Sequence, residues 1–141
     1  MKYLIILLCN VMLSVTNAEA QTGDILEINK TIHSCAKAAD QSNVEKLDML
    51  LDDNYVIVMN RLFGSSEVSV MTKETYLGKI RTKEFGGDNR KIEIQGVMVN
   101  LNSASAKVVF IGEKMTFTSI ILLIKNAEGQ WKLVNETPMV T

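Results

Sequence analysis

The sequence predicts an α+β domain whose helices lie in its N-terminal half and whose strands lie in its C-terminal half. Apolar residues recur at helical spacing between Gly23 and Asp40 and again between Val44 and Leu51. From Lys91 onward the apolar residues alternate with polar ones, as they do in strands. A run of helices followed by a run of strands is typical of the α+β class, and 141 residues suit one domain with a real core.

The first twenty residues have the three parts of a secretory signal peptide. Lys2 gives a positive start, residues 3–13 form an apolar run, and residues 18–20 (AEA) are a cleavage signal. A membrane anchor is the alternative reading, but a spanning helix needs about 20 apolar residues, and Asn10 interrupts this run. We therefore expect a signal peptide over residues 1–20, a domain over residues 21–141, and a periplasmic or secreted protein that leaves the membrane after cleavage.

Charge and cysteine content argue against several functional classes. The chain has 15 basic and 16 acidic residues, so it offers no strongly basic surface for nucleic acid. Cys9 lies in the predicted leader, which leaves Cys35 as a lone thiol on the apolar stripe of the first helix. With one histidine and no metal-ligand spacing, we expect neither a metal nor a cofactor.

Caps and turns predict the next elements. Ser42 and Glu45 form a capping box that begins a second helix, and Asp52-Asp53 end it before a strand at residues 55–60. Residues 67–71 pair back as a hairpin. Thr72 then caps a third helix over residues 73–83, and the basic residues that follow, Arg90 included, are interpreted as a solvated helix end and loop.

The rest of the chain is predicted to be strands. They lie at residues 91–101, 104–112, 115–125 and 130–137, with a β-bulge at Gln95-Gly96 and Pro138 beyond the last strand.

The run Ile120–Ile124 is apolar on both faces of its strand. An antiparallel strand with one solvent-exposed face normally alternates between apolar and polar residues. Both faces of the sheet must therefore be covered here. The helices can cover one face, and we expect a second copy of the chain to cover the other. The homodimer contact would use Ile120, Leu122 and Ile124, or else Ile121 and Leu123.

Four segments, at residues 39–47, 51–55, 72–77 and 128–135, occur in an order and spacing that resembles the nuclear-transport-factor-2-like superfamily. The chain is most similar to its SnoaL-like and "putative lumazine-binding" branch. The resemblance implies a cone-shaped roll, also called cystatin-like, in which a curved antiparallel sheet wraps around three helices. It also implies an apolar pocket at the open end.

Three functions are compatible with this resemblance. The first is an exported binding or accessory domain for a small apolar molecule, with no chemistry of its own. The second is a dehydratase, cyclase or isomerase of the SnoaL type that uses His33 or a strand carboxylate, and the third is a structural dimerisation module. In isomerase-like relatives the base and its tyrosine partner fall at positions that are Val58 and Ser34 here, so we assign no catalytic residue.

Candidate pocket residues are polar or adaptable side chains on the expected helices and strands. Asn135 and Glu136 lie on opposite faces of the last strand, so one of them is expected to face the pocket, and we choose Asn135. The full candidate set is His33, Tyr55, Met59, Tyr76, Met98, Trp131 and Asn135.

Overall fold

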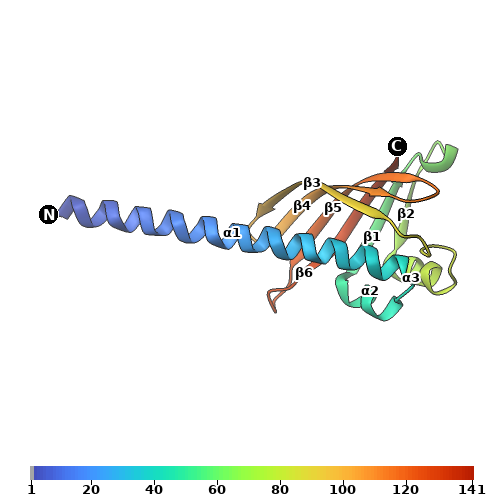
Figure 1. Ribbon diagram of the computed structural model, residues 1–141, viewed down its shortest axis with the longest axis horizontal. Coiled ribbons are helices and arrows are strands. Elements are labelled where there is room, and N and C mark those ends of the chain that lie inside the picture. The colour runs from blue at the N-terminus through green and yellow to red at the C-terminus, as the bar shows by residue number, and fades with distance from the viewer. Residues whose placement is uncertain (1) are drawn as a thin grey trace.

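The computed structural model describes the backbone of residues 2–141 and the side chains of residues 19–141 (Figure 1). Its elements follow the predicted order of two helices, a hairpin, a third helix and four further strands. They are α1 (Lys2–Asp40), α2 (Val44–Leu50), β1 (Leu51–Asn60), the 3-10 turn η1 (Leu62–Gly64), β2 (Val68–Thr72), α3 (Lys73–Arg81), β3 (Lys91–Asn100), β4 (Ser103–Ile111), β5 (Thr116–Lys125) and β6 (Trp131–Val140).

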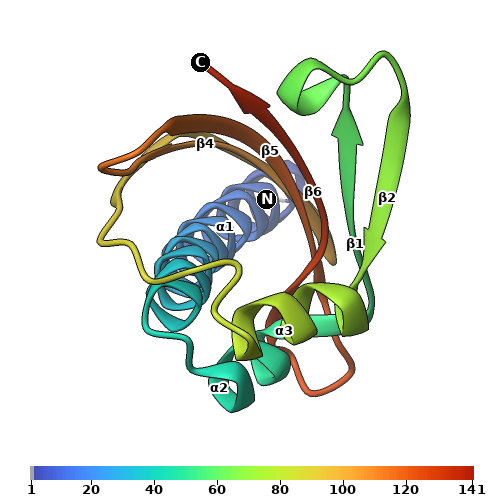
Figure 2. The ribbon, with the colours of Figure 1, turned by 90° about the vertical axis from the view of Figure 1, so that its right-hand side faces the viewer.

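The sheet curves around α1, while α2 and α3 lie at one end of the curve (Figure 2). Its strand order is β2-β1-β6-β5-β4-β3. The predicted α+β cone is therefore confirmed, with one difference in detail. β1 pairs with β6 in parallel, whereas the other neighbouring strands are antiparallel.

Helix α1 is longer than the sequence indicates. We expected a helix to begin at Gly23 and Asp24, but α1 runs unbroken through both. A single glycine costs a helix only about 1 kcal/mol, and the only proline of the chain is Pro138. The side chains of residues 1–18 lie outside the described part, so the signal peptide stays a prediction. Among the described residues, no helix is both long and apolar enough to cross a membrane.

Two helix caps were predicted, and one of them is displaced. Thr72 caps α3 as expected, because its Oγ1 accepts from the amide of Thr75 at 3.3 Å. For α2 the cap is Asn43, whose Oδ1 accepts from the amide of Lys46 at 3.0 Å, and not Ser42. Ser42 has a left-handed φ of 53°, which places it in the turn before the helix.

Bulges give the sheet its curvature. The bulge predicted at Gln95-Gly96 is confirmed, since the pairing of β3 with β4 shifts between Ile94 and Gly96. A second bulge lies in β6, where Leu122 pairs with Asn135 but Leu123 pairs with Leu133. The residue between these two β6 partners is therefore extra.

Two strand boundaries differ from the prediction. β1 begins at Leu51, so Asp52 and Asp53 belong to the strand and not to a turn. β6 continues through Pro138 to its end at Val140. Proline is tolerated there because the pairs with β1 reach only to Glu136, which leaves one side of β6 without a ladder to interrupt.

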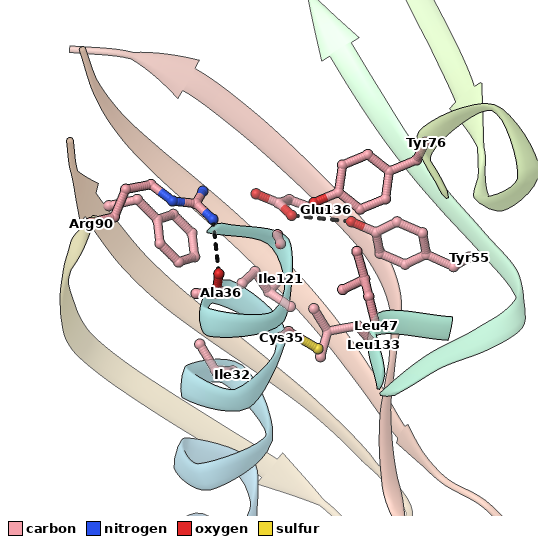
Figure 3. A pocket seen from close by; sticks show the side chains of 12 residues that line it. Ile32, Cys35, Ala36, Leu47, Tyr55, Tyr76, Arg90, Ile121, Leu133 and Glu136 are labelled. Carbon is pink, nitrogen blue, oxygen red and sulfur yellow. Dashed lines mark hydrogen bonds between the residues drawn. The ribbon is translucent and has the colours of Figure 1, made fainter. Parts of the chain in front are cut away.

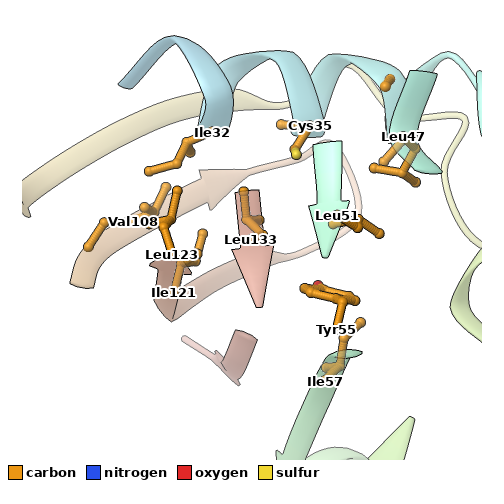
Figure 4. Close-up of a cluster of buried hydrophobic side chains, with 14 of the residues drawn as sticks. Ile32, Cys35, Leu47, Leu51, Tyr55, Ile57, Val108, Ile121, Leu123 and Leu133 are labelled. Atoms are coloured by element: carbon orange, nitrogen blue, oxygen red, sulfur yellow. The ribbon is translucent and has the colours of Figure 1, made fainter. Parts of the chain in front are cut away.

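The core fills the space between α1 and the concave face of the sheet (Figure 4). Cys35 is buried in it, as expected for a structural thiol, and burial raises the pKa of the thiol well above its usual value. On β5, Ile121 and Leu123 point into this core, while Ile120 and Leu122 are exposed on the convex face. Of the two alternatives for the homodimer contact, only the set with Ile120, Leu122 and Ile124 is on the open face.

Asp24 anchors α1 to the far end of the sheet. Its Oδ1 accepts from Lys125 Nζ at 2.5 Å and from Trp131 Nε1 at 3.1 Å. The hydrogen bond from Lys125, reinforced by Trp131, holds the pKa of the Asp24 carboxyl below its usual value despite partial desolvation. A carboxyl with a lowered folded-state pKa stabilises the fold above the unfolded pKa and loses that effect as the pH falls through the lower value.

Asp24→Asn is therefore expected to lower the free energy of unfolding at neutral pH by about 1 kcal/mol. The difference from the unaltered protein should shrink between neutral and acidic pH, as the pH falls through the lowered pKa of the Asp24 carboxyl in the folded state. Urea unfolding at the two pH values measures this. Glu27→Gln is the control, since Glu27 pairs with Lys30 at 3.8 Å on the exposed side of the same helix. Equal effects of the two substitutions would contradict the anchor.

Candidate functional site

Two adjoining cavities lie inside the open end of the cone. The inner one has a volume of about 30 Å³ and the outer one about 380 Å³. Ligand pockets usually measure about 300–1,000 Å³, so the outer cavity is large enough for a small molecule. The side chains that line both, and so mark where they meet, are Ala39, Tyr76, Arg90, Phe110 and Glu136.

The outer cavity has mostly apolar walls, supplied by elements far apart in the sequence. The hairpin β1–β2, helix α3 and strands β4–β6 each contribute. The apolar lining includes Ile57, Met59, Met71, Ile80, Phe85, Phe117 and Pro138. An apolar molecule can therefore bury most of its surface here.

Glu136 places a carboxylate at the boundary of the two cavities (Figure 3). Its Oε2 accepts from the hydroxyl of Tyr55 at 3.1 Å, and its Oε1 accepts from the hydroxyl of Ser119 at 2.7 Å. Both donors are buried. A carboxylate offers about four acceptor positions on its two oxygens, so Glu136 retains acceptor capacity toward the cavity.

The bulge in β6 is what turns Glu136 inward. Trp131 and Leu133 are buried, and strict alternation from them would place Asn135 on the inner face. The extra residue, Val134, shifts this phase by one. Glu136 therefore pairs with the buried Ile121 and faces the cavity.

Arg90 enters the site from the loop before β3. Its Nε donates to Asp40 Oδ1 at 2.6 Å, and its backbone amide donates to Asp40 Oδ2 at 3.2 Å. Its Nη2 donates to the carbonyl of Ala36 at 3.3 Å, and its guanidinium lies 5.1 Å from the ring centre of Phe110. Arg90 and Glu136 point toward each other across the cavity (Figure 3), although no ion pair joins them within the described residues.

Gly86 allows this loop to reach helix α1. Its φ of 84° is left-handed, and a Cβ atom there would lie 2.3 Å from the carbonyl oxygen of Ala39. The next residue, Gly87, donates its amide to the carbonyl of Asp40 at 2.9 Å. The loop is thereby held against the C-terminal end of α1, which brings Arg90 to the Asp40 carboxylate.

Tyr76 adds a hydroxyl that has no hydrogen-bond partner among the described residues. Its ring packs 6.0 Å from that of Tyr55 and 6.4 Å from that of Phe85. Burial raises the pKa of Tyr76, and the nearby Glu136 raises it further. Burial and Glu136 likewise raise the pKa of Tyr55. Both phenols therefore stay protonated at neutral pH, and that of Tyr76 is available as a donor.

Residues 20–137 match the family described as "putative lumazine-binding". The chain belongs to this family. No curated protein sequence matches it.

Solved structures with the same fold include a nuclear-transport-factor-2-like protein from Silicibacter pomeroyi, with a TM-score of 0.74, 13% identity, and coverage of 86% of this chain and 98% of the other. A protein from Novosphingobium aromaticivorans described as a "putative scytalone dehydratase" has a TM-score of 0.66, 14% identity and 88% coverage of both chains. A ketosteroid isomerase-like protein from Erwinia carotovora has a TM-score of 0.62, 15% identity, and coverage of 80% of this chain and 92% of the other. At such identities the likeness shows the fold alone.

In this member of the family, three of the seven candidate residues line the cavities. Tyr55 lines the inner cavity, Met59 the outer one, and Tyr76 both. They come from strand β1 and helix α3, so the structure brings together residues that are well separated in the sequence.

His33 and Met98 lie outside both cavities. His33 is exposed on α1, and its Nδ1 bonds to the carbonyl of Asn29 at 2.9 Å. It lies off the stripe that packs against the sheet, as a residue next to Ile32 on a helix must. Met98 is exposed on β3 because the bulge before it turns its side chain to the convex face.

Trp131 and Asn135 also lie away from the cavities. Trp131 is buried at the opposite end of the sheet, where it donates to Asp24. Asn135 is turned away by the β6 bulge, and its Nδ2 donates to the carbonyl of Val56 at 3.4 Å. The choice of Asn135 over Glu136 was therefore wrong.

The two isomerase-related positions do not contribute to the cavities either. Val58 alternates with the cavity-lining Ile57 and Met59, so it faces the convex side, where it pairs with Val70. Ser34 lines neither cavity. The carboxylate of this site comes instead from the last strand.

The predicted candidate set does not include four residues of this site, namely Asp40, Arg90, Ser119 and Glu136. Arg90 was wrongly assigned to a solvated loop. Ser119 carried a usable signal, since it shares the inward phase of Ile121 on β5 and is polar. A polar residue in the buried phase of a strand needs a hydrogen-bond partner inside the fold.

Among the described residues, no group of three metal-ligating side chains is found.

Proposed function

We propose that this protein binds a small, largely apolar molecule in the outer cavity and holds the polar end of that molecule at Glu136. The observation that carries the proposal is a cavity of about 380 Å³ with apolar walls that ends at a carboxylate. Such a space favours binding over a purely structural module, because a packed core has few voids larger than a water molecule.

A second candidate function is an enzyme of the dehydratase, cyclase or isomerase type. It is favoured by Glu136, a carboxylate inside a cavity with the Tyr55 hydroxyl 3.1 Å away and the Tyr76 hydroxyl nearby. A carboxylate can accept a proton from a substrate while a phenol donates to the developing oxyanion. Glu136-dependent deuterium uptake by a bound ketone in heavy water would separate this enzyme from a domain that only binds.

The methionines provide a direct test of binding in the outer cavity. Met59, Met71 and Met115 line it, whereas Met98 and Met139 are exposed and do not. With ¹³C-methyl methionine labelling and the neutral apolar probe N-phenyl-1-naphthylamine, we expect NMR shift changes in the first three methyl groups. The exposed pair is the internal control.

Shift changes confined to the control methionines would show that the probe binds the convex face and would contradict the proposal. Saturable shifts at Met59 and Met71, with a matching change in probe fluorescence, would support it.

We also propose that the protein is a homodimer through the convex face of its sheet. Val70, Met98, Ile120 and Leu122 are large apolar side chains exposed on this face, and large exposed apolar patches typically mark interaction sites. Sedimentation velocity at micromolar concentration should show a dimer, and Leu122→Lys should convert it to a monomer. A clean monomer for the unaltered protein would contradict the proposal.

A further inference from the structure

We propose that the ligand of this cavity is a cation, namely a protonated amine or a similar positive group on an apolar body, whose charge pairs with Glu136. This inference rests on the proposed binding function and adds the chemical class of the ligand to it.

The charges of the side chains around the junction of the two cavities do not balance. Arg90 and Glu136 are the two charged side chains that line both cavities, and Asp40 lines the outer cavity beside Arg90. Arg90 and Asp40 form an ion pair at 2.6 Å, so their charges cancel. The hydrogen-bond donors to Glu136 are two uncharged hydroxyls, and no ion pair involves it within residues 19–141. One negative charge is therefore left over.

Glu136 is half-buried, so its carboxylate has lost part of its contact with water. Charges that are removed from water are normally paired, because the removal is costly without a counter-charge. Tyr55 and Ser119 stabilise the Glu136 carboxylate only in part, with one hydrogen bond to each oxygen. An ammonium group in the cavity could donate to the acceptor positions that remain and would supply the missing positive charge.

The aromatic walls point to the same class of ligand. Tyr76, Phe85, Phe110 and Phe117 all line the outer cavity. Aromatic faces attract cations within about 6 Å of the ring centre. Two of these rings already contact a cation of the protein. Lys79 Nζ lies 5.2 Å from the ring centre of Phe85, and the Arg90 guanidinium lies 5.1 Å from the ring centre of Phe110.

An anionic ligand fits the site less well. Arg90 is the only cation where the cavities meet, and its Nε and Nη2 are already bonded to Asp40 and Ala36. An anion would have to compete with Asp40 and would also meet the charge of Glu136. At the rim, Glu84 is paired with Lys79, so the remaining Lys114 and Asp88 supply no net positive charge for an anion.

Three probes of nearly equal shape and different charge test the inference. They are 2-naphthylmethylamine, which is a cation at neutral pH, the uncharged 2-naphthylmethanol, and the anion 2-naphthoate. In calorimetric titrations of the full protein, the amine is expected to bind at least about 10-fold more tightly than the alcohol. A gain of this size is what one charge-assisted hydrogen bond contributes to affinity. The anion is expected to bind most weakly.

Glu136→Gln should reduce the affinity for the amine to that for the alcohol, because the amide keeps the size of the side chain and loses its charge. Glu93→Gln is the matched control, since Glu93 pairs with Lys91 outside the cavities and should leave all three affinities unchanged. If Glu136→Gln does not fold, the affinities of the three probes for the unaltered protein decide whether the ligand is a cation.

Two results would overturn the inference. One is an amine that binds no more tightly than the alcohol, including the case in which neither binds. The other is tightest binding by 2-naphthoate, which would make Arg90 the recognition group. Either result leaves the binding function standing if N-phenyl-1-naphthylamine still shifts the cavity methionines. Binding by none of the four probes would overturn the proposed function as well.

Discussion

Leu123→Ala is expected to lower the free energy of unfolding by about 3 kcal/mol, whereas Leu122→Ala should cost less than about 1 kcal/mol. The two residues are neighbours on β5 and have the same side chain. Leu123 is 1% exposed and packs in the core between the sheet and α1, whereas Leu122 is 43% exposed on the convex face.

The physical reason is the cavity that truncation leaves behind. Removing buried methyl groups loses their transfer free energy, and the surrounding atoms of a close-packed core relax only in part. At Leu122 the lost methyl groups border on open space, so no enclosed void forms. Because the two substitutions share a strand and a residue type, differences in strand propensity largely cancel.

Urea unfolding followed by circular dichroism measures both variants. The protein concentration should be varied, since a dimer through the convex face would make the apparent stability of the Leu122 variant depend on concentration. Equal losses for the two variants at low concentration would mean that the inner and outer faces of β5 are wrongly assigned.

Asp40→Asn is expected to cost about 2–4 kcal/mol of stability, because it breaks an ion pair that is mostly buried. The side chains of Arg90 and Asp40 are 21% and 11% exposed. The substitution leaves the Arg90 charge without its counter-ion and weakens two hydrogen bonds to Asp40. The loop before β3 would then lose part of its attachment to α1.

Glu93→Gln is the control for this substitution also. The pair of Lys91 with Glu93 is 2.7 Å long but much more exposed, and exposed ion pairs contribute only about 0–1 kcal/mol. Thermal and urea unfolding at neutral pH compare the two variants. A loss for Asp40→Asn as small as that for Glu93→Gln would show that Arg90 finds another partner, for which Glu136, facing it across the cavity, is a candidate.

Local patterns were enough to predict most of the elements. The Thr72 cap and the bulge at Gln95-Gly96 were both found from a few consecutive residues. The burial of Cys35 followed from its place on a helical stripe. These features depend on spacing within one segment, so they can be read without knowledge of the partners.

The polar part of the site could not be predicted in this way. Arg90 is half-buried because it meets Asp40, which lies 50 positions earlier in the chain. Glu136 points inward because β6 carries an extra residue opposite β5, and that bulge exists only in the pairing of the two strands. A shift of one residue turns a strand's side chains to the other face. The alternation of apolar and polar residues therefore could not predict whether Asn135 or Glu136 faces the cavity.

The sequence by itself determined the class of the fold and the order of its elements, because periodicity and caps act over a few residues. The cone and its apolar pocket were implied by the resemblance to a known family. Only the tertiary structure decided which side chains meet inside the cone. The pairing of Glu136 with Tyr55 and Ser119, and of Arg90 with Asp40, depends on strand register and on a loop that packs against a distant helix. Such contacts are set by long-range packing, which no local pattern encodes.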